Sequence, residues 1–154
     1  MNLRKWMQPA EMVATIGVLV SVVFLVFEVR DNSALTKAES YSASVVALNE
    51  WRLQLAADED LSRLFVEFRK SGVQGMDEVE VQRFDFLFGS LWSIYESAYF
   101  AREYETLGQN EWERHRGVMC RMYDLSVHHE FWSIMQAKLS PIFAEQVAIE
   151  CRST

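Results

Sequence analysis

The feature that most constrains this chain is an uncharged, proline-free run of apolar residues near its N-terminus. The run, MVATIGVLVSVVFLVF, extends from Met12 to Phe27 and lies between Glu11 and Glu28. No later stretch of the chain is apolar over such a length without a charge. A helix of this length covers roughly 24 Å, against roughly 30 Å of bilayer hydrocarbon. The run therefore predicts a short transmembrane helix.

The flanking residues extend the predicted span at both ends. Trp6 beside Arg4 and Lys5 is typical of an interfacial anchor, and Glu28 with Arg30 marks the other headgroup layer. Two alternative interpretations fit less well. A buried helix of a soluble protein usually has an apolar run of about 10–14 residues, and a cleaved signal peptide needs a small-x-small cleavage site, which does not follow the run. The sequence therefore favours an uncleaved anchor in membrane lipid.

One narrow face of the predicted anchor carries mostly small residues. At 100° per residue, the following positions fall in one sector: Ala10, Ala14, Gly17, Ser21 and Glu28. Small residues let helices approach closely in lipid, and Gly17-x-x-x-Ser21 has the small-xxx-small spacing that favours association. This stripe predicts a homo-oligomer, although small residues also occur in membrane helices that do not associate. A pore lined by the stripe, with a ring of Glu28 at its mouth, is an alternative.

The rest of the chain has room for one domain. After the anchor, about 120 of the 154 residues remain, which is ample for a helical core. A hydrophobic fraction of 50 % with 13 % aromatic residues indicates a packed domain rather than disorder. The net charge of −7, without any Lys/Arg cluster, disfavours nucleic acid and anionic headgroups as partners. We expect an N-terminal tail and anchor over residues 1–32 and a helical soluble domain over residues 33–154.

Apolar spacing after the anchor predicts helices and no strands. Residues 33–57 keep the helical period, so the anchor is expected to continue into them, with a bend near residues 31–33. Asp58 or Asp60 is expected to cap a short helix that Gly72 ends. The predicted fold class is all-α, with a single N-terminal transmembrane helix continuing into a bundle of about four to five helices.

The next helix is the predicted core helix. Asp77 and Glu80 form a capping box signature, and about 28 helical residues with a broad aromatic face are expected to follow. Asn110 and Ser126 are expected to cap later helices, and Ser140-Pro141 is expected to open the last one. The aromatic face must be buried, either by the other helices or by a second subunit.

A candidate pocket lies on this aromatic face. Its predicted residues are Trp92, Tyr95, Glu96 and Tyr99. A carboxylate among aromatic rings either has a raised pKa or pairs with a cation. The favoured interpretation is that Glu96 pairs with an arginine such as Arg102 or Arg83.

The sequence signals for a metal site or a catalytic site are weak. The cluster closest to a metal site combines Cys120, His128, His129 and Glu130, with His115 nearby in sequence. Zinc sites are usually announced by C-x-x-C or H-x-x-x-H spacing, and adjacent histidines on a helix point to different faces. No phosphate-binding loop, positioned cysteine nucleophile or Ser-His-Asp arrangement is identifiable. We therefore predict no metal, no cofactor and no catalytic residue, and the sequence leans against an enzyme.

Compartment and orientation are only weakly indicated. Cys120 and Cys151 are compatible with a disulfide in an oxidising compartment and with free thiols in the cytosol. Two basic residues lie close to the anchor on each side, so charge does not fix its orientation. The free N-terminal amine tips the balance towards an N-terminus inside the cell.

Three strings of the chain resemble a group of uncharacterised small bacterial membrane proteins that have one N-terminal transmembrane helix and an all-helical tail. The strings are NEWRLQLAADEDLSRLFVEF, SLWSIYESAYFAREYETLGQNEWE and HHEFWSIMQAKLSPIFAEQV. The shared fingerprints are Tyr-Glu-x-x-Tyr, a Glu/Trp pair after a turn, and Ser-Pro-x-Phe. The resemblance covers nearly the whole chain and implies this architecture and a bacterial source. It implies no activity. The expected location is the bacterial inner membrane.

The sequence thus predicts a membrane-anchored helical interaction or scaffold protein that self-associates through its anchor and its aromatic core helix. The first alternative is a homo-oligomeric channel or pore component. The second, weaker alternative is a small-molecule sensor with a pocket in the aromatic core. The expected partners are membrane lipid and further copies of the chain. No nucleic acid is expected, and the sequence leaves open a further protein partner without identifying it.

Overall fold

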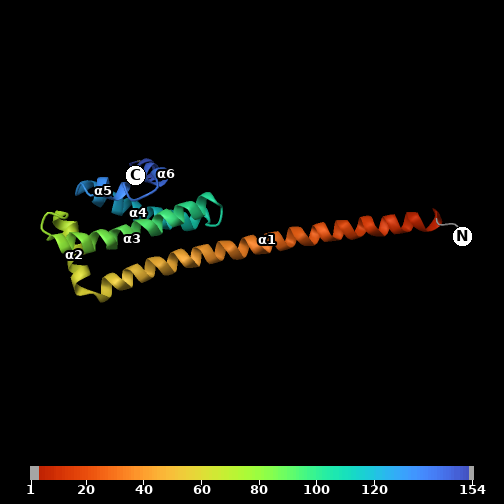
Figure 1. The fold of residues 1–154 in the computed structure, drawn as a ribbon, viewed down its shortest axis with the longest axis horizontal. Coiled ribbons are helices and arrows are strands. Elements are labelled where there is room, and N and C mark those ends of the chain that lie inside the picture. The colour runs from red at the N-terminus through yellow and green to blue at the C-terminus, as the bar shows by residue number, and fades with distance from the viewer. Residues whose placement is uncertain (1–3, 153–154) are drawn as a thin grey trace. The chain divides into compact units, whose positions relative to one another are not determined.

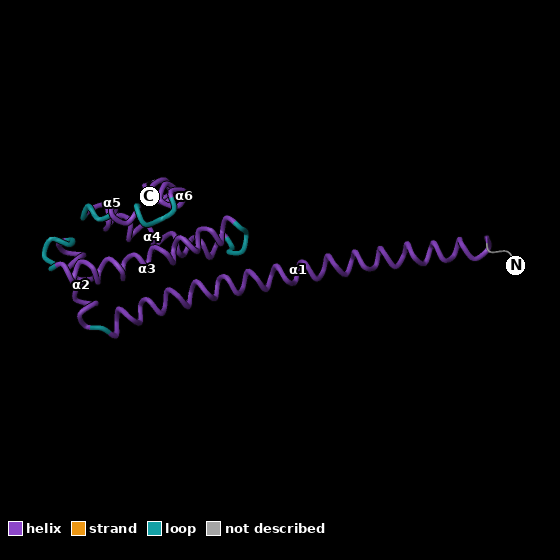
Figure 2. Tube along the Cα trace, viewed as in Figure 1, coloured by secondary structure: helices purple, strands orange, loops and turns teal. Residues whose placement is uncertain are grey.

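In the computed structural model, the chain is mostly helical in the part that the structure describes, which is residues 4–152 for the backbone and residues 16–152 for the side chains. Figure 2 shows helices and connecting loops, with no strand in this part of the chain. The first helix, α1, extends from Arg4 to Ala57 and is helical through residues 31–33, where the sequence suggests a bend. No proline or glycine lies between residues 18 and 57 to interrupt it. The all-α prediction is confirmed.

The chain divides into two compact units, Met1–Lys37 and Ala38–Thr154. The first unit holds the N-terminal part of α1. The second holds the remainder of α1 and five shorter helices in the described residues: α2 Glu59–Ser71, α3 Glu78–Glu103, α4 Gln109–His128, α5 Trp132–Gln136 and α6 Pro141–Arg152. Within the second unit, α3 packs against α2 and α4, while α4 also contacts α5 and α6 (Figure 1). The second unit is therefore a helical bundle.

Side-chain caps set the starts of α2 and α3. The Asp58 carboxylate accepts a hydrogen bond from Leu61 N at 3.0 Å, and α2 begins there. Asp77 and Glu80 make the two reciprocal bonds of a capping box, at 2.9 Å and 3.0 Å. Gly72 ends α2 with a φ of 70°, a conformation that glycine adopts without strain. These predictions are confirmed.

Two other predicted caps are wrong. The helix α4 begins after Gly108, so Asn110 lies inside its first turn. It then continues through Ser126, whose buried hydroxyl donates to Met122 O at 2.6 Å. A serine hydroxyl bonded to the carbonyl four residues earlier fits a helix interior. The chain instead turns at Glu130, which has a φ of 58°.

The aromatic face of α3 forms the centre of the core in the second unit. The ring of Phe68 on α2 stacks on Phe84 with a centroid distance of 4.3 Å. Trp51 on α1 is buried, and its Nε1–H donates to Leu87 O of α3 at 2.8 Å. The aromatic residues that are at most 2 % exposed are Phe68, Phe84, Phe88, Trp92, Tyr95, Trp112, Phe131 and Phe143. The core is thus built mainly from aromatic rings contributed by several helices.

Candidate functional site

The apolar segment of α1, residues 16–29, exposes large hydrophobic side chains on every side. Each of the following is at least 49 % exposed: Ile16, Val18, Leu19, Val20, Val22, Val23, Phe24, Leu25, Val26, Phe27 and Val29. Because an α-helix has 3.6 residues per turn, the uninterrupted stretch from Val22 to Phe27 points in all directions around the axis. A helix that is apolar all round is typical of a buried or membrane-embedded element.

Within the described residues, no helix combines the length and the apolar character needed to cross a membrane. The side chains of Met12–Thr15, which begin the predicted span, lie outside the described residues. The transmembrane helix stays a prediction.

The small-residue stripe is described in part. The side chains of Ala10 and Ala14 lie outside the described residues, whereas Gly17, Ser21 and Glu28 are exposed. A Cβ placed on Gly17 would meet no atom within 4 Å, so no contact within the described chain requires glycine there. The Ser21 hydroxyl donates to Gly17 O at 2.8 Å, so its proton is satisfied by its own helix. The packing role of the stripe stays a prediction.

The predicted pocket residues on α3 are mostly packed into the core. Trp92 and Tyr95 are 0 % exposed and Tyr99 is 5 % exposed. Burial raises the pKa of the Tyr95 hydroxyl, which has no hydrogen-bond partner in the described chain. Trp92 lines a cavity of about 250 Å³ between α3 and α5, to which Asp85 also contributes. The pocket predicted among the aromatic residues stays a prediction.

Glu96 does not pair with the predicted arginine. Its Oε1 accepts a hydrogen bond from the backbone N–H of Ser140 at 2.7 Å, at the start of α6. Arg102 instead bonds to Glu150 at 2.9 Å, and Arg83 lies near the carboxylates that begin α2. Glu96 binds the Ser140 amide because it faces a helix N-terminus, where backbone N–H groups lack partners within their own helix.

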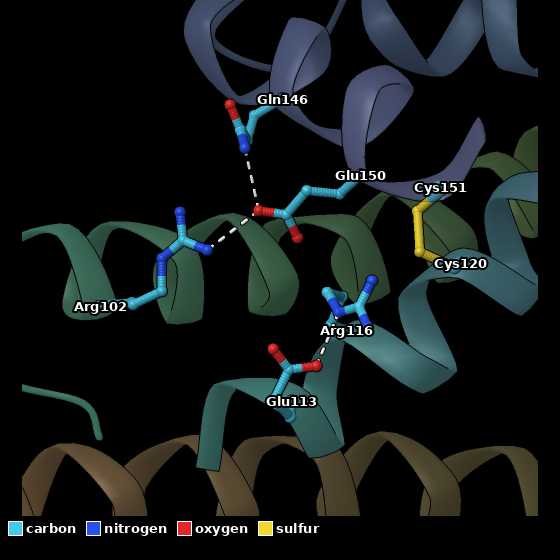
Figure 3. The surroundings of a disulfide bond; sticks show 7 residues. All are labelled: Arg102, Glu113, Arg116, Cys120, Gln146, Glu150 and Cys151. Carbon is cyan, nitrogen blue, oxygen red and sulfur yellow. Dashed lines mark hydrogen bonds and ion pairs between the residues drawn. A yellow bond between two sulfur atoms is a disulfide. The ribbon is translucent and has the colours of Figure 1, made fainter. Parts of the chain in front are cut away.

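A disulfide and an ion pair join α6 to its neighbours (Figure 3). Cys120 on α4 and Cys151 on α6 are buried and bonded to each other, with a Cα–Cα distance of 5.0 Å. Beside them, Glu150 Oε1 accepts hydrogen bonds from Arg102 of α3 and from Gln146, both at 2.9 Å. The sequence leaves open whether these two cysteines are paired or free. In the structure they form a cross-link between α4 and α6.

The disulfide removes Cys120 as a thiolate ligand or nucleophile, because both roles need a free sulfur. His128 and His129 are neighbours whose rings meet edge to face, with centroids 4.8 Å apart. In the part of the chain that the structure describes, no group of three or more His, Cys, Asp or Glu side chains is placed to hold a metal ion.

A second cavity, of about 230 Å³, lies between α1 and α4 inside the second unit. His115 is 4 % exposed there, and its Nε2 lies 3.1 Å from Ser44 Oγ. Burial lowers the pKa of His115, and the positive charge of Arg52 adds to the effect. No sequence pattern predicts this cavity, because the helical spacing of Tyr41 and Leu48 indicates ordinary core packing.

Comparison of the chain with models of protein families, with curated proteins and with solved structures found no match. The resemblance drawn from the three sequence strings therefore stays a prediction.

Proposed function

We propose that this protein is a membrane-anchored helical scaffold that self-associates through its anchor. The observation that carries the proposal is the exposure of apolar side chains on every side of residues 16–29. A protein partner would cover one face of such a helix and leave the others in water. Lipid covers all faces at once, so a bilayer is the environment that best suits this segment.

The residues that follow the apolar segment support this arrangement. Glu28, Arg30 and Asp31 are exposed, and they place charge at the C-terminal end of the segment. Charged side chains at that position suit the headgroup layer. The predicted span is short for a bilayer, so close packing against neighbouring helices is favourable.

Self-association is supported by the face that contains Gly17 and Ser21. The space around Gly17 is open, so a second helix can approach its backbone closely. Ser21 bonds to its own helix and therefore brings no unsatisfied hydroxyl proton into lipid. A copy of the same anchor is the proposed occupant, because it would present the same small-residue face.

The proposed location is the bacterial inner membrane, with the helical domain on its outer side. The Cys120–Cys151 disulfide supports an oxidising compartment for this domain. Basic residues flank the predicted anchor on both sides, Arg4 and Lys5 before it and Arg30 and Lys37 after it, so the proposed orientation depends on the disulfide.

The first test is membrane insertion. After alkaline extraction of membranes from cells that express the full chain, the proposal expects the protein in the membrane pellet. A variant with Val22→Arg and Val26→Arg, which places two charges in the apolar segment, is expected to be released. Release of the unaltered chain would overturn the proposal.

The second test is the oligomeric state of the full chain in mild detergent, measured by light scattering with correction for detergent mass. Gly17→Leu with Ser21→Leu is expected to shift oligomer to monomer, because the larger side chains keep the helices apart. Val23→Leu with Val26→Leu, on the opposite face, is the matched control and should leave the mass unchanged. Equal masses for all three proteins would contradict self-association through this face, and ion flux from proteoliposomes would support the pore alternative instead.

A further inference from the structure

We infer that the second unit binds another copy of itself head to tail, through a turn at one end and a groove at the other. The turn consists of the exposed residues Glu103, Tyr104 and Glu105, between α3 and α4. The groove is lined by residues of α2 and of the C-terminal half of α4, and its volume is about 660 Å³. Both surfaces belong to the second unit, so this contact is separate from the proposed packing of the anchor.

The groove has an apolar floor. Phe65 of α2 and Met122 and Leu125 of α4 line it, and each is only partly buried against the core. The ring of Phe65 lies edge to face with Trp51, with a centroid distance of 6.0 Å, so the packed core supports this floor. Apolar surface of this kind, gathered at one place on the surface, is typical of an interaction site.

The exposed edge of the groove is mainly positive. Its exposed residues are Arg69, Arg121, Asp124 and His128. Neither arginine forms an ion pair in the part of the chain that the structure describes. Two guanidinium groups and one carboxylate make this edge positive in a chain whose net charge is −7. Such a groove favours a partner that presents an apolar side chain next to a carboxylate.

The turn presents that combination. The ring of Tyr104 is 74 % exposed and lies between two glutamates. The Glu103 carboxylate is paired with Arg102 at 2.7 Å, whereas Glu105 forms no ion pair within the described residues. Tyrosine is among the residues that contribute most to binding at protein interfaces. In the proposed contact, Tyr104 packs on the apolar floor and Glu105 lies beside the arginines.

Backbone hydrogen bonds hold the turn in one conformation. The Glu105 N–H donates to Arg102 O at 2.9 Å, and the Leu107 N–H donates to Ala101 O at 2.9 Å. Leu107 is 3 % exposed and fixes the end of the turn in the core. Because the turn is ordered before it binds, docking costs little conformational entropy.

The turn of one copy cannot reach its own groove. In Figure 1, α2 lies beside the start of α3, where Phe68 stacks on Phe84, and the turn follows the other end of α3. The 26 residues of α3 cover roughly 39 Å between these ends. The occupant is therefore a second copy. Since the two surfaces differ, each copy can bind one neighbour at each end, which gives a ring or an open row of copies.

Photo-cross-linking tests the contact. The full chain in detergent micelles carries p-benzoylphenylalanine in place of Tyr104, together with Gly17→Leu and Ser21→Leu, so that the anchor stripe does not bring the copies together. After irradiation, we expect a cross-linked dimer, and mass spectrometry should place the link in residues 65–69 or 121–128. No dimer, or a link elsewhere in the chain, would overturn the inference.

Position 86 provides a matched control for the probe. Phe86 is an aromatic residue on α3 that is 69 % exposed and lies outside the turn and the groove. With p-benzoylphenylalanine at this position instead, no link to residues 65–69 or 121–128 is expected. The same link from position 86 would show unspecific contact and would contradict the site.

A charge exchange tests the pairing of Glu105 with the arginines. Glu105→Arg and Arg121→Glu are each expected to lower the yield of the cross-link roughly fivefold, because an attraction becomes a repulsion. A chain with both changes should regain the yield, since the exchanged charges attract again. Arg152→Glu, at an exposed position on α6, is the control and should keep the yield. A double variant as weak as the single ones would contradict the proposed docking.

Mixing two defective chains tests the head-to-tail arrangement. The first chain carries Arg69→Glu and Arg121→Glu together with the probe at position 104, so its groove is defective. The second carries Tyr104→Ser and Glu105→Arg, so its turn is defective. The first chain alone should give no cross-link, and addition of the second should produce one, located in the groove of the second chain. A cross-link between copies of the first chain, or none in the mixture, would overturn the inference.

Discussion

Glu96 completes the start of a helix that is distant in sequence. Its carboxylate accepts from Ser140 N at 2.7 Å, while Ser140 Oγ lies 3.4 Å from Phe143 N. Pro141 is the first residue of α6, as the sequence predicts, and has no N–H that needs a partner. The α6 N-terminus is thus satisfied jointly by its own residues and by a carboxylate on α3.

This arrangement predicts that Glu96→Ala lowers the free energy of unfolding by about 1–3 kcal/mol, because a part-buried N–H loses its acceptor. Glu96→Gln keeps an acceptor oxygen and should lose less. Urea unfolding of the full chain in detergent, followed by circular dichroism, measures the change. Glu145→Ala, at an exposed position on α6, is the control. Equal losses in the alanine variants would show that the Ser140 contact contributes nothing.

The lowered pKa of His115 is expected to make the stability of the fold depend on pH. Burial lowers its pKa in the folded protein, so below about pH 6.5 the unfolded chain binds more protons than the folded one. The free energy of unfolding is therefore expected to be fully present above that pH and to fall as the pH drops towards the folded pKa. Glu80 and Glu113, whose pKa values are lowered by hydrogen bonds from arginines, act at still lower pH.

Urea midpoints between about pH 7.5 and pH 5.5 measure this effect, since the window brackets the ordinary histidine pKa. His115→Gln should flatten the dependence, whereas His128→Gln, at an exposed position, should keep it. A dependence that survives in His115→Gln would assign the proton uptake to another group.

Among the contacts between helices, the disulfide joins α4 to α6 covalently and is expected to stabilise the second unit. Cys120 and Cys151 are 31 residues apart. In the chain-entropy account, a link of this separation lowers the entropy of the unfolded chain and so raises the free energy of unfolding by about 3–4 kcal/mol. The double variant with both cysteines replaced by serine should lose about that much in urea unfolding. Reduction of the unaltered chain should cause a similar loss, and reductant should not affect the double variant. An unchanged midpoint after reduction would contradict the prediction.

The elements differ in how far the sequence predicted them. The caps at Asp58 and Asp77 were predictable, because each uses groups within three residues along the chain. The partner of Glu96 is 44 residues away, and the partner of Cys120 is 31 residues away, so neither follows from spacing. Ser126 shows where local sequence is ambiguous. A serine that bonds back into its own helix has the same local sequence as one that caps a helix start, so the cap prediction is wrong there.

The candidate site was harder to predict than the fold. The cavity between α1 and α4 combines side chains from residues 41–52 with others near His115, and only the folded chain brings these segments together. The burial that leaves His115 Nδ1 without a partner among the described residues likewise depends on the packing of both helices. The sequence instead predicts a pocket on the aromatic face of α3. Large aromatic side chains indicate burial there, whether or not they surround a ligand.

Along the chain, an apolar segment precedes an acidic helical domain. The net charge of −7 disfavours contact between the domain and anionic headgroups. In the proposed arrangement, the anchor rather than surface charge therefore holds the domain at the membrane. Membrane association would then depend on the anchor and not on the surface of the domain. A charge change on that surface should therefore leave membrane association intact.

The proposed orientation in the membrane predicts which side of the membrane a protease must reach to cut the helical domain. With the tail inside and the disulfide-bonded domain outside, trypsin added to right-side-out inner-membrane vesicles should cut the domain. Arg69 and Lys70 are exposed at the end of α2 and offer cleavage sites beside the loop to α3. Inside-out vesicles should protect the domain until detergent is added, and equal cleavage of both preparations in detergent is the control. Cleavage confined to inside-out vesicles would reverse the orientation and would place the Cys120–Cys151 link in a reducing compartment, where such bonds rarely persist.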